Sequence, residues 1–112
     1  MPRRAEDPRW TDPGLLVMGS LAEGAKHGYA ILQDVQHTSG VQMGPGTLYG
    51  ALARLEERGL IEALEARDPR RRPYRLTARG ATVLAEQVES MQRFTALSRR
   101  RMARGTVAWR PA

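Results

Sequence analysis

The sequence predicts a mainly helical protein with one small β-hairpin and a long helix near its C-terminus. Three observations support this fold class. Apolar residues recur every three or four positions in three short segments, which is the spacing of amphipathic helices. A segment of alternating apolar and acidic residues comes next, and two prolines separate it from a second short strand-like segment. The last segment is amphipathic over roughly 27 residues, so a helix there would be ~40 Å long.

The three short helices are expected over residues 14–24, 28–38 and 45–58. Asp12 can cap the first of them, and Pro13 suits a first helical position. The expected inward residues are Leu15, Met18, Leu21 and Ala22 in the first helix, Ile31, Leu32 and Val35 in the second, and Leu48, Ala51, Leu52 and Leu55 in the third. These stripes predict that the three helices share one core.

The spacing of apolar residues changes after Gly59. Residues 60–66, LIEALEA, alternate in the way a half-buried strand does, and residues 74–76, YRL, can form the returning strand. A turn rich in arginine and flanked by prolines lies between them. Thr77 can cap a final helix that extends to Arg104. The sequence therefore predicts a hairpin with a basic tip, followed directly by the long helix.

Three helices and a hairpin in this order describe a winged helix-turn-helix. We expect an N-terminal arm over residues 1–13 and a winged helix-turn-helix domain over residues 14–76. A C-terminal dimerisation helix over residues 77–104 and a flexible tail over residues 105–112 complete the expected organisation.

The composition argues against several classes of function. The chain has no cysteine, which excludes disulfides, thiolate metal sites and a cysteine nucleophile. His27 and His37 have no third ligand near them, so we expect no metal. No glycine-rich loop or activated serine is present, so we expect neither a cofactor nor an enzyme. No apolar run approaches the ~20 residues of a membrane helix, and the first residues do not resemble a secretion signal, so we expect a cytoplasmic protein without membrane contact.

The positive charge is concentrated in two short blocks. The chain has 18 basic and 12 acidic residues, a net charge of +6. Residues 67–79 contain six arginines and Asp68, and residues 93–112 contain six arginines and no acid. A guanidinium group binds phosphate through two parallel hydrogen bonds, so these blocks indicate an anionic partner. A GC-rich genome could explain the number of arginines, but it explains their clustering less well.

The third helix and the hairpin tip carry most of the candidate contacts to DNA. The outward face of the helix is small near its start, which would let it fit closely into a major groove. Adjacent cations at the tip repel one another, whereas a duplex would stabilise them through counterion release. The candidate DNA-binding residues are Lys26, Thr47, Tyr49, Gly50, Arg54, Arg70, Arg71 and Arg72. The plainer alternatives are a solvated helix face and a solvated charged loop.

The last helix carries an apolar stripe that three short helices cannot cover by themselves. A partner helix would cover the remainder, which predicts a homodimer. The candidate dimer-interface residues are Leu84, Val88, Met91 and Phe94. The alternative is that the stripe packs within one chain and the helix frays early. The role of the cluster from Arg99 to Arg104 stays open, because a helix dipole favours cations at this end in any case.

Three stretches of the sequence resemble the PadR family of bacterial transcriptional regulators, in its short form with a single C-terminal dimerisation helix. They are LLVMGSLAEGAKHGYAILQDV, GPGTLYGALARLEERGLIE and RRRPYRLTARG, and the resemblance spans residues 14–104. Its most specific pieces are the pair Gly28-Tyr29, residues 45–49 (PGTLY) and residues 74–77 (YRLT) followed by Gly80.

The resemblance implies a dimeric repressor that binds a double-stranded, pseudo-palindromic operator and is released by a small effector. Residues 45–58 match the recognition helix of the family, and residues 67–74 match its wing. The wing departs from the family at Pro73, where an aromatic or basic residue is common, and a proline there suits an edge strand.

The resemblance also implies a site for the effector. In some short members the dimer interface holds planar aromatic compounds beside an aromatic residue of the last helix. Met91 stands at that position here, which departs from the pattern, although Phe94 lies one turn further on. The candidate effector-pocket residues are Trp10, Val88 and Met91. Trp109 has no assigned role.

Two alternatives belong to other classes of function. One is a small hydrolase or ligand-carrying enzyme, which the missing catalytic constellation argues against. The other is a winged-helix module whose basic wing binds RNA or a partner protein. Binding without a preference for duplex DNA would favour that alternative.

Overall fold

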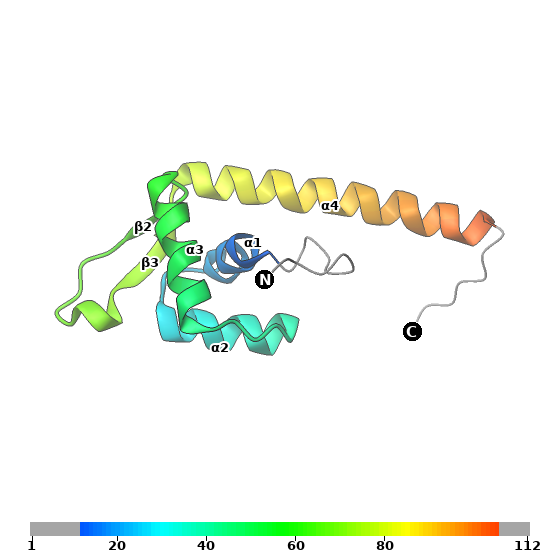
Figure 1. Cartoon of the computed structure of the whole chain (residues 1–112). Coiled ribbons are helices and arrows are strands. Elements are labelled where there is room, and N and C mark those ends of the chain that lie inside the picture. The colour runs from blue at the N-terminus through cyan, green and yellow to red at the C-terminus, as the bar shows by residue number, and fades with distance from the viewer. Residues whose placement is uncertain (1–11, 106–112) are drawn as a thin grey trace.

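The computed structural model describes residues 12–105, which form four α-helices and a small sheet of three strands (Figure 1). The helices are α1 (Pro13–Leu21), α2 (Gly28–Ser39), α3 (Pro45–Glu57) and α4 (Ala78–Arg104). The strands are β1 (Lys26–His27), β2 (Ile61–Ala63) and β3 (Pro73–Leu76), and a short 3-10 helix, Pro69–Arg71, lies between β2 and β3. The expected mainly helical fold with a small hairpin is confirmed.

The helices begin where the sequence places capping residues. The Asp12 carboxylate accepts a hydrogen bond from the backbone N–H of Leu15 at 3.2 Å, and Pro13 occupies the first turn of α1. The Thr77 hydroxyl accepts one from the N–H of Gly80 at 3.0 Å at the start of α4. Each cap satisfies a backbone donor that has no partner inside its own helix.

The core lies between α1, α2 and α3 and is closed by β2 and the first turns of α4. Its buried apolar residues are Val17, Met18, Leu21, Ile31, Val35, Leu48, Ala51, Leu52, Leu55, Leu60, Ile61 and Leu84. The stripe predicted for α3 is buried throughout. In α1 the expectation for Ala22 was wrong, because the helix ends at Leu21 and Ala22 lies in the exposed turn that follows. Val17 is fully buried in α1 instead.

The three strands form an antiparallel sheet in the order β1-β3-β2. Ile61 pairs with Leu76 and Ala63 with Tyr74 in the predicted hairpin. The first strand of the hairpin is shorter than the predicted residues 60–66, because the pairing with β3 ends at Ala63 and only the N–H of Leu64 adds a further bond, to the carbonyl of Pro73.

The strand β1 was not expected from the sequence. It pairs Lys26 with Tyr74 and His27 with Pro73, so β3 is the middle strand of the sheet. The expectation that Pro73 suits an edge strand was therefore wrong. Pro73 is the first residue of β3, a position where the missing N–H of proline is tolerated.

The helix α4 crosses the domain at its start and then projects away from it (Figure 1). A β-carbon on Gly80 would fall on the carbonyl oxygen of Leu60, so only glycine allows this close crossing. The Thr77 hydroxyl also donates to the carbonyl of Gly59 at 2.6 Å, which ties the start of α4 to the end of α3. Gly80 and Leu84 are the buried residues of this helix. No helix within residues 12–105 is long and apolar enough to cross a membrane.

Candidate nucleic-acid interface

The helix α3 has one buried face and one open face, as its sequence predicts. Leu48 and Leu52 are in the core, whereas Thr47 and Arg54 are exposed and Gly50 is partly exposed. Half of the Tyr49 surface, 51%, is accessible to solvent. Groups that bind phosphates and base edges therefore flank the open face, with Thr47 and Arg54 on one flank and Tyr49 on the other.

Tyr49 also determines how closely α2 approaches α3. A β-carbon on Gly28 would lie 2.8 Å from the Tyr49 hydroxyl oxygen and 3.3 Å from Cδ2 of Leu48. Gly28 therefore lets the first turn of α2 pack directly against α3. The Tyr49 hydroxyl lies at this junction, between the two helices of the helix-turn-helix.

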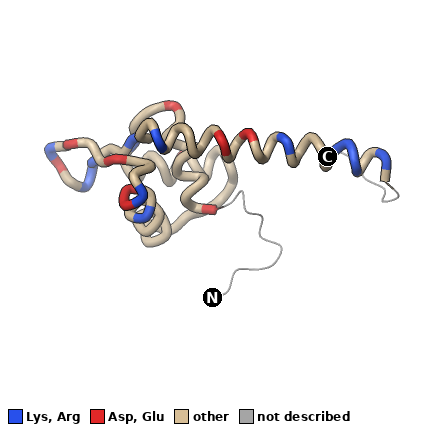
Figure 2. Tube along the Cα trace, turned by 90° about the horizontal axis from the view of Figure 1, so that it is seen from above, with Lys and Arg blue, Asp and Glu red and all other residues tan. Residues whose placement is uncertain are grey.

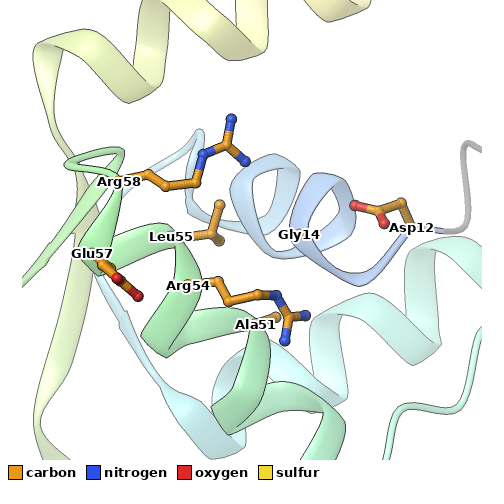
Figure 3. A pocket seen from close by; sticks show the side chains of 7 residues that line it. All are labelled: Asp12, Gly14, Ala51, Arg54, Leu55, Glu57 and Arg58. Atoms are coloured by element: carbon orange, nitrogen blue, oxygen red, sulfur yellow. The ribbon is translucent and has the colours of Figure 1, made fainter.

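Arg54 extends along α3 in the direction of α1 (Figure 3). One of its guanidinium nitrogens would lie 3.4 Å from a β-carbon on Gly50, so the side chain lies over this glycine. It also lines an open hollow of about 410 Å³ between α1 and α3, together with Asp12, Leu55 and Arg58. The predicted contact between Arg54 and DNA stays a prediction.

The arginines of the wing tip are exposed, and their backbone is ordered by one aspartate. Asp68 caps the 3-10 helix by accepting from the N–H of Arg70 at 3.0 Å, and it also pairs with Nε of Arg70 at 3.3 Å. The Arg70 side chain is 89% exposed in spite of this pair. Arg71 and Arg72 are exposed as well, and Figure 2 shows this basic tip at the end of the molecule opposite the end of α4.

Closer to the base of the wing, the positive charge is neutralised within the sheet. Arg75 donates from Nε to the Glu62 carboxylate on the neighbouring strand at 2.6 Å. An exposed pair of this kind contributes ~0.2–1 kcal/mol. At the tip, by contrast, three adjacent arginines extend into solvent, where a nucleic acid could reach them.

Lys26, which the sequence predicts as a DNA contact, lies in a different setting. Its ammonium group forms ion pairs with Glu23 at 2.9 Å and Asp34 at 3.2 Å, and it donates to the carbonyl of Ser20. The side chain is 15% exposed. Contact with a phosphate would compete with these partners, and sequence spacing gives little sign of them because they belong to different elements.

The predicted dimer-interface residues differ in how far they are buried. Leu84 belongs to the core of its own chain, whereas Val88 and Phe94 are exposed and Met91 is half-buried. Phe94 is 71% exposed, which is unusual for a side chain of this size and polarity. An apolar stripe therefore continues along α4 beyond the domain that buries its first turns.

The candidate effector residues do not gather in one pocket. Val88 lines a hollow with Leu76 on one side of α4, and Met91 lines another with Leu15 and Phe94 on the other side. Trp10 and Trp109 lie outside the described residues. Within the described part of the chain, no three His, Asp or Glu side chains lie close enough together to hold a metal ion.

Sequence comparison assigns most of this chain to one family. A model of the transcriptional regulator PadR-like family matches residues 17–86, which is more than half of the chain. An uncharacterized 37.1 kDa protein in transposon TN4556 of Streptomyces fradiae is 45% identical over 87 residues, 78% of this chain. The match covers 25% of that protein, so the present chain spans about a quarter of its relative's length.

Solved structures share the fold. A transcriptional regulator from Clostridium thermocellum superposes with a TM-score of 0.73 at 24% identity, covering 88% of this chain and 97% of its own. A PadR family transcription regulator from Clostridium difficile gives 0.71 at 24% identity, covering 79% and 95%. RosR from H. salinarum gives 0.65 at 30% identity, covering 79% and 77%. The family match shows that the chain belongs to the PadR-like family of transcriptional regulators, and the solved structures show that it shares their fold.

Proposed function

We propose that the chain acts as a homodimeric regulator that reads a specific operator with α3 and its wing. The observation that carries this proposal is the open face of α3 beside a hairpin whose exposed tip holds three adjacent arginines. The helix and the hairpin pack against each other (Figure 1), so both can engage one duplex at the same time.

In the proposed complex, α3 enters the major groove by its N-terminal end. The small residues around Gly50 allow the backbone to come close, while Thr47 and Tyr49 donate hydroxyl hydrogen bonds to phosphates. Arg54 reaches a phosphate or the edge of a guanine. The arginines from Arg70 to Arg72 hold the flanking backbone or minor groove and supply salt-dependent affinity.

The dimer is proposed from the part of α4 that leaves the domain. Val88, Phe94, Leu97 and Met102 are exposed on this part of the helix. A second copy would cover this apolar surface and place two recognition helices on one face of the assembly. Two copies of α3 about one helical turn apart would match a pseudo-palindromic site.

Repression and release by a small effector are proposed from the resemblance to short family members. A planar ligand at the α4 helices would change the distance between the two recognition helices. The dimer would then no longer match the spacing of the operator and would release it. The hollow beside Met91 and Phe94, of about 1120 Å³, offers an apolar wall for such a ligand. Val88 lines a separate hollow, so a ligand that touches both Val88 and Met91 would need the partner helix as well.

The test compares two duplexes of equal length, the DNA upstream of the gene for this protein and a shuffled version, at two salt concentrations. We expect tighter binding to the native duplex that weakens as salt rises. The variant Arg70→Ala/Arg71→Ala/Arg72→Ala should bind both duplexes more weakly, with a shallower salt slope. Equal binding of both duplexes would reject sequence-specific reading of this DNA, and an unchanged affinity of the triple variant would reject the role of the wing.

A further inference from the structure

Lys26 is the centre of a small polar cluster between α1, β1 and α2. Its ammonium group contacts the carbonyl of Ser20 in the last turn of α1 and Glu23 in the turn that follows. It also contacts Asp34 on α2. The same Asp34 oxygen accepts a hydrogen bond from the Ser20 hydroxyl at 2.7 Å. Ser20 is itself buried, whereas the side chains of Lys26 and Asp34 are 15% and 30% exposed, so the cluster joins the two helices at the edge of the core.

Both charges of the cluster are stabilised by their neighbours. Burial alone would lower the pKa of Lys26, but its bonds to Glu23 and Asp34 outweigh this effect and raise the pKa above its usual value. The bond from Ser20 lowers the pKa of Asp34, with a further contribution from Lys26 that opposes the effect of burial. The pair therefore stays ionised near neutral pH.

The backbone beside this cluster contacts both parts of the proposed DNA-binding surface, the wing and α3, and it also begins α2. Lys26 pairs with Tyr74 of the wing, and His27 pairs with Pro73. The side chain of His27 accepts from the N–H of Ala30 at 3.3 Å and so caps α2. The next residue, Gly28, lies under the Tyr49 hydroxyl of α3.

We infer that Lys26 is a positioning residue, which through Asp34 and Ser20 holds β1 in place and thereby sets the wing relative to the recognition helix. A strand of two residues forms too few backbone hydrogen bonds to fix its own position, so the side-chain cluster supplies the missing constraint. The inference rests on the proposed reading of DNA by α3 and the wing. In it, Lys26 affects operator binding without touching the nucleic acid.

The rival role is direct contact between the Lys26 ammonium group and a phosphate. The two roles differ in the effect of Asp34→Asn, which removes a negative charge while keeping the shape of the side chain. If Lys26 bound phosphate, this change would free the ammonium group and leave DNA binding equal or tighter. If Lys26 positions the wing, the same change should weaken binding, because it loosens β1.

The experiment uses the full chain and a duplex that the wild-type protein selects from a random-sequence pool, with a scrambled duplex of equal length. The variants are Lys26→Met, which keeps most of the aliphatic stem, and Asp34→Asn. The control is Glu65→Gln, which removes an exposed negative charge from the segment that follows β2. Circular dichroism melts show whether each variant is folded at the assay temperature, and Asp34→Asn decides the question if Lys26→Met is unfolded.

Both cluster variants should bind the selected duplex about tenfold more weakly. A loss of this size is typical of residues that affect a binding site through packed neighbours without touching the ligand. Binding to the scrambled duplex, the salt slope and the Glu65→Gln control should stay near wild type. Hydroxyl-radical footprints should lose the flanking protection that the wing gives and keep the protection in the centre.

Two outcomes would overturn the inference. One is tighter binding by Asp34→Asn together with a salt slope reduced by about one in Lys26→Met, which is the signature of a phosphate contact. The other is wild-type binding and footprints in both variants. A wild-type protein that selects no sequence would instead contradict the proposed function itself, so the two failures can be told apart.

Discussion

The compact domain and the projecting part of α4 use the same helical spacing of apolar residues for different purposes. In α3, Leu48 and Leu52 are buried by other elements of the same chain. In α4, Leu84 is buried in the same way, but Phe94, three turns further on, is largely exposed. Apolar periodicity thus identifies which side of a helix is covered, and the length of the helix relative to its domain decides whether the covering group can come from the same chain.

The junction between the two regions depends on Gly80, and Gly80→Ala should give the largest effect on stability. The added β-carbon would collide with the backbone carbonyl of Leu60, which cannot move without shifting β2. We expect a loss of about 3 kcal/mol or more in the free energy of unfolding, measured by chemical denaturation.

The matched control is Gly19→Ala in α1. A β-carbon there meets nothing within 4 Å, so the change should stabilise the protein by up to ~1 kcal/mol through helix propensity. Equal effects of the two substitutions would contradict the close crossing of α4.

Phe94→Ser tests the projecting region alone. Loss of an aromatic side chain from the centre of an interface should raise the dissociation constant of the proposed dimer about thirtyfold, measured by analytical ultracentrifugation. The core variant Leu48→Ala should instead lose about 2–5 kcal/mol of unfolding free energy and keep a dimer wherever it is folded. A Phe94→Ser variant that dimerises like wild type would show that the stripe on α4 is not the interface.

Thr77→Ala weakens the same junction more gently than Gly80→Ala. The hydroxyl group caps α4 and also donates to Gly59, so its removal should destabilise the protein by ~1–2 kcal/mol. Thr82→Ala, at an exposed position inside α4, should be neutral or slightly stabilising and serves as the control in thermal melts. A similar melting temperature for the two variants would mean that the cap contributes nothing.

The elements that the sequence predicts well are those that are determined by residues close together along the chain. Caps such as Asp12 and Thr77, and the inward stripe of α3, depend on neighbours within a few residues along the chain. The strand β1 could not be predicted in this way, because two residues carry no pattern and their pairing depends on where β3 lies in space.

The candidate site shows the same division. The exposure of Arg70 to Arg72 follows from a proline-flanked turn, so the sequence indicates it. The surroundings of Lys26 depend on how α1 and α2 cross, and the separation of Val88 from Met91 depends on which side of α4 the domain occupies. Residue type suggested a role for these three side chains, but only the packing of elements distant in sequence determines what each one touches.

The smallest expected effect concerns the ion pair that fastens β1 to the domain. The folded state lowers the pKa of Asp34, so the folded protein releases this proton more readily than the unfolded chain does. The stabilisation is therefore complete above the pKa of an ordinary aspartate and is lost as the pH falls through the lower pKa of the folded state. The raised pKa of Lys26 acts at the other end of the scale, where stability is lost as the pH rises through its folded-state value. Between these limits the pair should contribute a constant stabilisation, and its side chains are accessible enough for salt to weaken it.

The measurement is the difference in unfolding free energy between wild type and Asp34→Asn, followed from neutral to acidic pH. This difference should stay constant at first and then shrink in the acidic range. A difference that grows on acidification would mean that Asp34 is not stabilised as a carboxylate, and the wing would then need another anchor.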